Sequence, residues 1–197
     1  MNYKKILKVA GVVAVAAIFC VGCSDEDGGD GGDGGTIKIG NQTWMAKNLN
    51  RATANSKCYY NSADSCAKYG RLYTWADAKS ACPSGWHLPS DAEWATLEDA
   101  VGGSSIAGTK LKATSGWSRG GSGTDEYNFS ALPGGYGYSD GSFNNGGAGH
   151  WWTATEAPAL LFEVNLAWSR HIRYGSENVE RIDFLKTDLL SVRCVED

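Results

Sequence analysis

Residues suited to metal binding or nucleophilic catalysis are scarce in this sequence. The 197 residues include only three histidines, His87, His150 and His171, and these are far apart in the chain. The four cysteines that follow Cys23 lack the C-x-x-C spacing of zinc and redox sites. We therefore expect no metal, no cofactor and no catalytic residue, and we predict that the protein is not an enzyme.

Positive charge is scarce as well. Three of the 18 lysines and arginines fall in residues 1–22, so the chain from Cys23 onward has 15 basic residues against 22 acidic ones, a net charge of −7. This balance argues against nucleic acid as a partner, and against binding driven by anionic lipid headgroups.

The first 22 residues are predicted to be a lipoprotein signal peptide. Three lysines precede an apolar run over 9–22 that is too short to span a membrane comfortably. The run ends in Cys20-Val21-Gly22-Cys23, which resembles a bacterial lipobox with Cys20 where leucine is usual. The resemblance implies cleavage before Cys23 and acylation, including palmitate, at that cysteine. An ordinary signal peptide is the alternative.

Residues 23–35 are predicted to be an acidic, glycine-rich tether. After Cys23 the segment contains only serine, aspartate, glutamate and glycine, so it has no apolar residue to bury. Acidic residues directly after a lipidated cysteine resemble the surface-export signal of Bacteroidota-type lipoproteins. We therefore expect a lipid-anchored protein of the outer membrane that faces the cell exterior, with a periplasmic location as the alternative.

The remaining cysteines are predicted to form two disulfides. Cys58, Cys66, Cys82 and Cys194 make an even number in an exported chain, and three pairings are possible. We favour Cys58–Cys66, which closes a short loop, together with Cys82–Cys194, which ties the end of a helix to the last strand.

Two helices are predicted on either side of a proline-containing corner. Residues 70–82 form the first, with Thr74 as its N-cap, and Pro83 cannot continue it. Ser90 and Glu93 have the S-x-x-E spacing of a capping box, so the second helix begins there and ends before the glycines at 102 and 103.

The other segments predict strands and loops. Together with the two helices, they indicate an α+β fold. A hairpin is expected over 36–44 and a loop over 51–68. Regular helix is not expected in the glycine-dense stretch 102–149, where aromatic side chains pin long loops to a core or form a surface. Short strands are expected at 151–155, 161–168, 171–174 and 190–195.

Six segments together resemble the Fibrobacter succinogenes major paralogous domain (FISUMP), which occurs in bacterial surface proteins. They are 39–49 (IGNQTWMAKNL), 70–75 (GRLYTW), 82–89 (CPSGWHLP), 123–135 (GTDEYNFSALPGG), 151–156 (WWTATE) and 191–195 (SVRCV). We take residues 36–197 as one such domain.

The resemblance implies a C-type-lectin-like fold, which is shared with formylglycine-generating enzymes. Such a fold has two helices, short antiparallel strands, long loops and a disulfide from a helix to the last strand, which Cys82 and Cys194 fit. The enzymes of this fold need reactive, metal-binding cysteines, whereas each mature cysteine here is assigned to a disulfide or the lipid anchor. The family carries no settled biochemical activity, and the Glu-Pro-Asn and Trp-Asn-Asp motifs of calcium-dependent lectins are absent.

Loop aromatics are the predicted ligand-binding residues, because aromatic rings stack on sugars and on partner side chains. The candidates are Tyr136, Tyr138, Phe143, His150 and Trp168. We expect a binding or adhesion module for a glycan or a surface protein. An enzyme of unknown class and a structural envelope protein are the alternatives. Three arginines at 170, 173 and 181 are either a basic patch or ordinary solvated strand residues.

Overall fold

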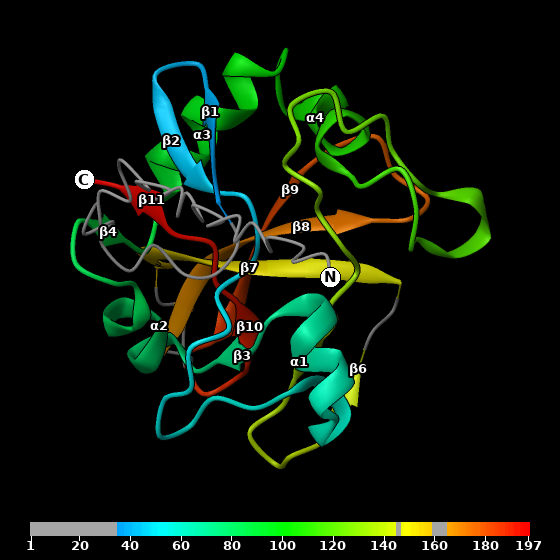
Figure 1. Cartoon of the computed structure of the whole chain (residues 1–197). Coiled ribbons are helices and arrows are strands. Elements are labelled where there is room, and N and C mark those ends of the chain that lie inside the picture. Colours follow the sequence, from blue (N-terminus) through cyan, green and yellow to red (C-terminus); the bar gives the residue numbers. More distant parts are fainter. Residues whose placement is uncertain (1–34, 145–146, 159–164) are drawn as a thin grey trace, which may run out of the picture.

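A computed structural model describes residues 35–144, 147–158 and 165–197, and within these ranges it has four α-helices and three β-sheets (Figure 1). The predicted signal peptide, Cys23 and all of the predicted tether except residue 35 lie outside the described residues. The prediction of a mixed α and β fold is confirmed.

A five-stranded sheet forms the middle of the domain (Figure 1). Its strands, in spatial order, are β3 (Leu72–Tyr73), β10 (Leu190–Ser191), β7 (Ala148–Glu156), β8 (Leu166–Arg173) and β9 (Glu180–Leu185). Strand β10 runs parallel to β7, while β7, β8 and β9 are antiparallel. The two strands predicted at 161–168 and 171–174 are a single strand, β8, and residues 161–164 lie outside the described residues. Strand β9 was not predicted.

A four-stranded sheet lies beside it, in the order β1 (Thr36–Ile39), β2 (Gln42–Met45), β11 (Val195–Glu196) and β4 (Trp86–His87). The predicted hairpin is confirmed, since Ile39 pairs with Gln42 across a turn in which Gly40 has a φ of +60°. The single closing strand predicted over 190–195 is wrong. The chain leaves the first sheet after β10 and enters the second at β11, and the linking residues hydrogen-bond to Met45 and Leu49 instead.

Both predicted helices are present, but the first begins at Trp75 and not at residue 70, because residues 72–73 form strand β3. Helix α2 (Trp75–Ala81) begins after Thr74, whose side chain accepts a hydrogen bond from the amide of Asp77. Helix α3 (Asp91–Ala100) begins with the complete capping box of Ser90 and Glu93.

Two further helices correct the prediction. Helix α1 (Ala63–Tyr69) lies in the stretch predicted as loop, and α4 (Ser104–Leu111) lies where regular helix was not expected. Tertiary contacts stabilise α4 despite its glycine. A Cβ added to Gly108 would lie 2.4 Å from the carbonyl oxygen of Asn178, so only glycine permits this close approach, and Leu111 is fully buried. Two 3-10 turns, η1 (Tyr59–Asn61) and η2 (Ser118–Gly120), complete the helical elements of the described residues.

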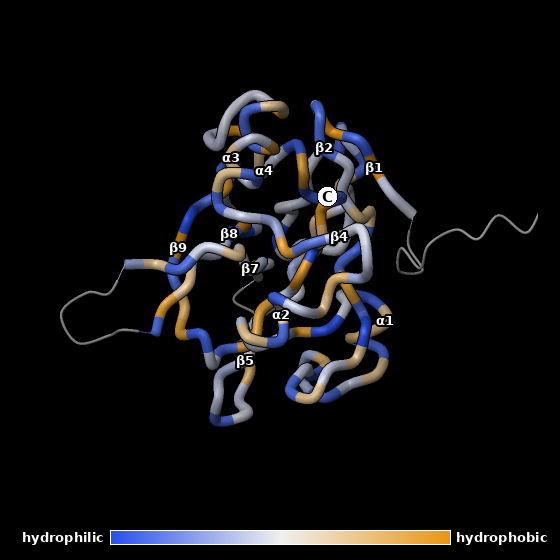
Figure 2. The backbone as a smooth tube through the Cα atoms, turned by 90° about the vertical axis from the view of Figure 1, so that its left-hand side faces the viewer, coloured by the Kyte–Doolittle hydropathy of each residue, from blue (hydrophilic) through white to orange (hydrophobic). Residues whose placement is uncertain are grey.

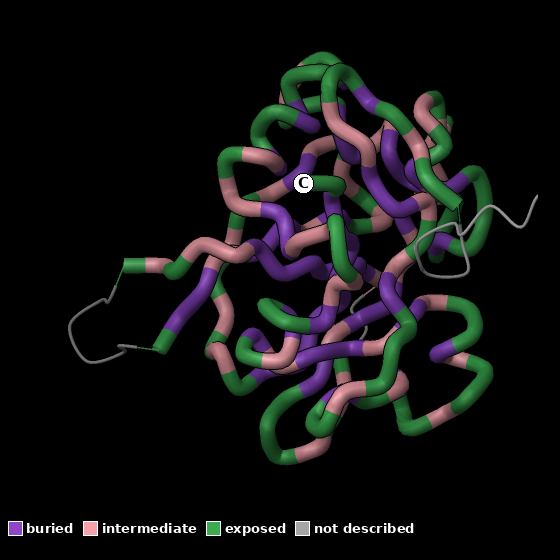
Figure 3. The backbone as a smooth tube through the Cα atoms, turned by 60° about the vertical axis from the view of Figure 1, so that its left-hand side comes forward, coloured by how far each residue is buried: buried purple, intermediate pink, exposed green. Residues whose placement is uncertain are grey.

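Tryptophans fill the core on both faces of β7. Trp151 joins a cluster with Trp44, Trp94 and Phe129, whereas Trp152 joins a second cluster with Trp75. Neighbouring residues of a strand point to opposite faces, so one strand anchors both clusters. Buried residues run through the central strands, while exposed residues lie mainly in the outer loops and on helix surfaces (Figure 3).

The structure has both predicted cysteine pairs at disulfide distance. Cys58–Cys66 spans 8 residues and joins the segment before η1 to helix α1. Cys82–Cys194 spans 112 residues and joins the end of α2 to the segment before β11. In the chain-entropy description, the longer closed loop contributes about 5 kcal/mol to stability and the shorter one about 2.5 kcal/mol.

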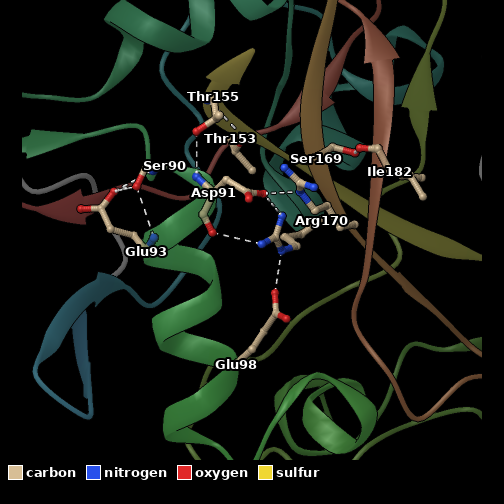
Figure 4. A network of polar contacts seen from close by, with 10 residues as sticks. Ser90, Asp91, Glu93, Glu98, Thr153, Thr155, Ser169, Arg170 and Ile182 are labelled. Atoms are coloured by element: carbon tan, nitrogen blue, oxygen red, sulfur yellow. Dashed lines mark hydrogen bonds and ion pairs between the residues drawn. The ribbon is translucent and has the colours of Figure 1, made fainter. Parts of the chain in front are cut away.

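Helix α3 is held against the sheet by the buried side chain of Arg170 (Figure 4). Its Nε donates to Glu98 Oε1 at 2.6 Å, and its Nη1 donates to Asp91 Oδ1 at 2.5 Å. Asp91 also accepts a hydrogen bond from Arg181 at 2.9 Å. Burial raises the pKa of Glu98, and Arg170 opposes this shift. Arg170 therefore fits neither of the two alternatives given for it, a basic patch or a solvated strand residue. It is the buried cation of an ion-pair network.

Replacing Arg170 by methionine is expected to reduce the free energy of unfolding by about 3–4 kcal/mol, because Glu98 would remain buried without its cation. Urea unfolding measures this. Arg173→Met is the matched control in the same strand, since Arg173 is exposed and pairs only at the surface with Glu180, so its loss should cost less than about 1 kcal/mol. Equal effects of the two substitutions would contradict the assigned role of Arg170.

Candidate functional site

The candidate site is built on a short hairpin formed by β5 (Tyr136–Gly137) and β6 (Phe143–Asn144). The hairpin lies at the end of the domain opposite β1 and β2 (Figures 1 and 2). Its turn is fixed by Asp140, whose Oδ1 accepts hydrogen bonds from the amide and the hydroxyl of Ser142 at 2.8 and 2.6 Å. Paired backbone hydrogen bonds between Gly137 and Leu189 attach the hairpin to the domain, so its side chains are presented from an ordered support.

One face of the hairpin carries the Tyr136 group, which we define as Tyr136, Tyr138, His150 and Phe184. The ring of Tyr136 lies 5.0 Å from Tyr138, 4.8 Å from His150 and 5.0 Å from Phe184, between ring centroids. The hydroxyls of Tyr136 and Tyr138 lie 2.7 Å apart. His150 is buried and Tyr138 is exposed, so the group extends from the sheet to the surface.

The other face carries the Phe143 group, which we define as Tyr59, Tyr60 and Phe143. Phe143 lies 5.6 Å from both tyrosine rings, and the two tyrosines lie 4.5 Å apart. Phe143 stands opposite Gly137 in the hairpin, where an added Cβ would come within 3.1 Å of the ring. The tyrosine at position 60 is 64% exposed, and its φ of +50° is uncommon for a residue other than glycine.

The structure brings four of the five predicted binding residues to this hairpin but not the fifth. Trp168 lies in β8 three residues before His171, whose ring stacks on His150. Because side chains alternate between the two faces along a strand, Trp168 points to the face opposite His171. There the guanidinium of Arg181 covers its ring at 3.6 Å.

Sequence reasoning missed Tyr59, Tyr60, His171 and Phe184. Two of these had a visible signal, because Tyr59 and Tyr60 are adjacent aromatics between two cysteines predicted to pair. The contacts of His171 and Phe184 depend on the pairing of β7, β8 and β9, which the sequence did not reveal.

His150, the buried member of the Tyr136 group, stacks on a second histidine, His171. The rings of His150 and His171 are 4.2 Å apart and nearly parallel. Burial holds the pKa of His150 well below its usual value and lowers the pKa of His171 to about 4, although Glu180 opposes the second shift. Both rings are therefore neutral at pH 7 and act as aromatic support. The described ranges contain no group of three or more His, Cys, Asp or Glu side chains suited to hold a metal ion.

Two other features resemble catalytic ones. Residues 116–120 (GWSRG) have the G-x-S-x-G spacing of a hydrolase nucleophile elbow. Ser118, however, is exposed in the single turn η2, and this turn does not connect a strand to a helix as a nucleophile elbow does. His87 contacts Asp197 and Glu93, at 2.7 Å each, and so links strand β4 to helix α3 and to the residue that follows β11.

These observations define a disulfide-bonded α and β domain with an aromatic hairpin at its surface. The family model of the Fibrobacter succinogenes major domain matches residues 37–196, and the chain therefore belongs to this family. No curated protein and no solved structure matches the chain. Among the described residues, no helix has the length and apolar character needed to cross a membrane.

The stacked histidines predict a loss of stability in mild acid. Because the folded-state pKa of His171 is below the unfolded value of about 6.5, the unfolded chain takes up the proton first as the pH falls. After allowance for solvent screening, the contribution of His171 to the free energy of unfolding should fall by about 1 kcal/mol between pH 7 and pH 5. His171→Phe should make the measured pH dependence shallower in urea unfolding.

His87→Gln provides the opposite control. Burial alone lowers the pKa of His87, but hydrogen bonds to Asp197 and Glu93 outweigh it and raise the pKa. Charged His87 therefore adds stability in acid, and its removal should make the decline steeper. The same change of slope in both variants would contradict the assignment.

Proposed function

We propose that the protein is a surface-displayed lipoprotein whose single domain binds a glycan or a protein ligand through the β5–β6 hairpin. One observation carries the proposal. Four large hydrophobic side chains are exposed in the described part of the chain, and two of them, Tyr60 and Tyr138, flank this hairpin. Exposed rings on an ordered support offer contact area at a small cost in side-chain entropy.

The backbone of Tyr60 supports the same proposal. A left-handed conformation costs of order 1 kcal/mol or more in a residue with a Cβ, and it persists only when the surroundings impose it. Here Cys58–Cys66 and the contacts with Tyr59 and Phe143 hold the conformation, and the result is an exposed ring. Strain that keeps an aromatic side chain in solvent is typical of a recognition surface.

The proposal extends to the fold relationship. Three features are those expected of a C-type-lectin-like fold: the Cys82–Cys194 disulfide, the long loops and the short antiparallel strands. An enzyme of the glycosidase type needs two carboxylates facing each other across a cleft. A cavity between residues 45–51 and helix α1 has no acidic residue in its lining, which favours binding over such chemistry there.

Tyr60→Ala together with Tyr138→Ala is expected to weaken ligand binding about tenfold or more, because each stacked ring contributes about 0.5–1.5 kcal/mol. A glycan array and a pull-down of surface proteins identify the ligand, and titration calorimetry measures the loss. Ile106→Ala with Leu185→Ala is the matched control, since it removes the other two exposed large side chains. Absence of any ligand, or equal binding by both double variants, would overturn the proposal.

The anchor has a separate test. Metabolic labelling with palmitate should mark the wild-type chain and not the Cys23→Ser variant, because the thiol of Cys23 is the proposed acylation site. Protease treatment of intact cells should remove the wild-type domain from the surface. Survival of the domain in intact cells, with digestion only after lysis, would place it in the periplasm.

A further inference from the structure

A second candidate site is a cavity of about 600 Å³ between the segment after β2 and helix α1. Its walls are residues 45–51, residues 66–70 and the loop around 130–132, with Arg193 beside them. Figure 1 shows the chain leaving β2 and passing α1. The two walls are joined by a hydrogen bond of 2.9 Å from Asn48 Nδ2 to the carbonyl of Tyr69. None of the lining residues belongs to the Tyr136 group or the Phe143 group.

The lining of the cavity is cationic, although the protein as a whole is acidic. Lys47, Arg51, Lys68 and Arg193 line it, and no aspartate or glutamate does. Across the described ranges, none of these four side chains forms an ion pair. No carboxylate of the described residues therefore lies within ion-pair distance of these cations, and only Asp125 acts on Arg193 from farther away, which favours an anion in the cavity.

Arg193 is the strongest indication, because it is a buried charge that forms no ion pair with any described carboxylate and instead packs on the ring of Phe129, 4.1 Å from its centroid. Only 2% of the residue is exposed. Its donors are directed to neutral oxygens, with Nε and Nη2 bonded to Asn48 Oδ1 at 3.0 and 2.8 Å and Nη1 bonded to the carbonyl of Phe129. Buried charges in proteins are ordinarily paired, since desolvation of an ion costs several kcal/mol. Burial accordingly lowers the pKa of this guanidinium, and the charge of Asp125 opposes the shift only in part.

The remaining lining is suited to a small organic molecule. Met45, Leu49, Tyr69 and Leu132 supply apolar surface next to the cations. A volume of this size is typical of sites that enclose a compact ligand, in which a few charged groups fix the orientation. The three exposed cations, Lys47, Arg51 and Lys68, then meet the part of the ligand that faces solvent.

We propose that this cavity binds a small carboxylate, carried either by a free organic acid or by an acidic sugar unit. Carboxylate oxygens accept charge-assisted hydrogen bonds from guanidinium and ammonium groups, and this chemistry matches all four cations. The site is separate from the aromatic hairpin, so it does not depend on the function proposed for that hairpin.

The acidic tether determines how the site must be tested. Five carboxylates at Asp25, Glu26, Asp27, Asp30 and Asp33 precede the domain. The chain enters the domain at Gly35, whose carbonyl accepts a hydrogen bond of 3.0 Å from the amide of Ala46 in the cavity wall. Titrations are therefore carried out on the full chain with these five residues changed to asparagine or glutamine, so that the tether cannot compete for the cations.

Calorimetric titration with galacturonate, succinate and galactose tests the proposal. Binding of galacturonate without binding of galactose is expected, because the two sugars differ chiefly in the carboxylate. Binding of succinate as well would identify free acids as ligands, and its absence would identify acidic sugars. Equal binding of galactose and galacturonate, or no binding of either acid, would overturn the proposal.

Lys47→Gln, Arg51→Gln and Lys68→Gln together should weaken galacturonate binding about tenfold, and these exposed positions should leave folding intact. Lys38→Gln, Lys57→Gln and Lys79→Gln form the matched control, since these lysines are also exposed, carry the same charge and lie outside the cavity lining. Equal losses in the two triple variants would show only a general charge effect and would overturn the assignment. Retention of hairpin ligands by the first triple variant distinguishes this site from the hairpin.

Discussion

The side-chain amide of Asn48 connects three distant parts of the chain. Its oxygen accepts hydrogen bonds from Trp151 Nε1 at 2.8 Å and from two nitrogens of Arg193, while its nitrogen donates to the carbonyl of Tyr69. Trp151 and Arg193 are buried, so water cannot replace this oxygen as an acceptor. Without the Asn48 oxygen, the guanidinium of Arg193 would keep only the carbonyl of Phe129 among its described acceptors. Strand β7, helix α1 and the segment between β10 and β11 would also lose their common contact.

The same strand serves both candidate sites. In β7, His150 supports Tyr136 beneath the hairpin, and the next residue, Trp151, bonds to Asn48 beside the cavity. Successive side chains of a strand point in opposite directions, so one element fixes both sites without forcing them to share residues. Strand β7 also pairs with β8, where Arg170 holds α3 in place. The two candidate sites are therefore parts of one ordered framework.

Local chemistry explains which elements the sequence could predict. The capping box of Ser90 and Glu93, the N-cap at Thr74 and the turn at Gly40 each depend on neighbouring residues, and each is found where it was expected. Helix α4 was missed because its stability comes from packing against segments far away in the sequence, as the approach of Gly108 to residue 178 shows. The position of Tyr60 likewise follows from a contact with the distant hairpin.

Charge illustrates why the cavity could not be predicted. The acidic total of the chain predicts that a polyanion is a poor partner, but a total says nothing of where charges gather after folding. The fold brings Lys47, Arg51 and Lys68 to one cavity with the buried Arg193. At physiological ionic strength exposed charges are screened over about 8 Å, so this local field acts mainly on a molecule that has already entered. An extended polyanion would meet the acidic remainder of the surface, whereas a compact carboxylate would meet the cations alone. The contrast between the acidic chain and this cationic cavity therefore supports the proposal of a small acidic ligand.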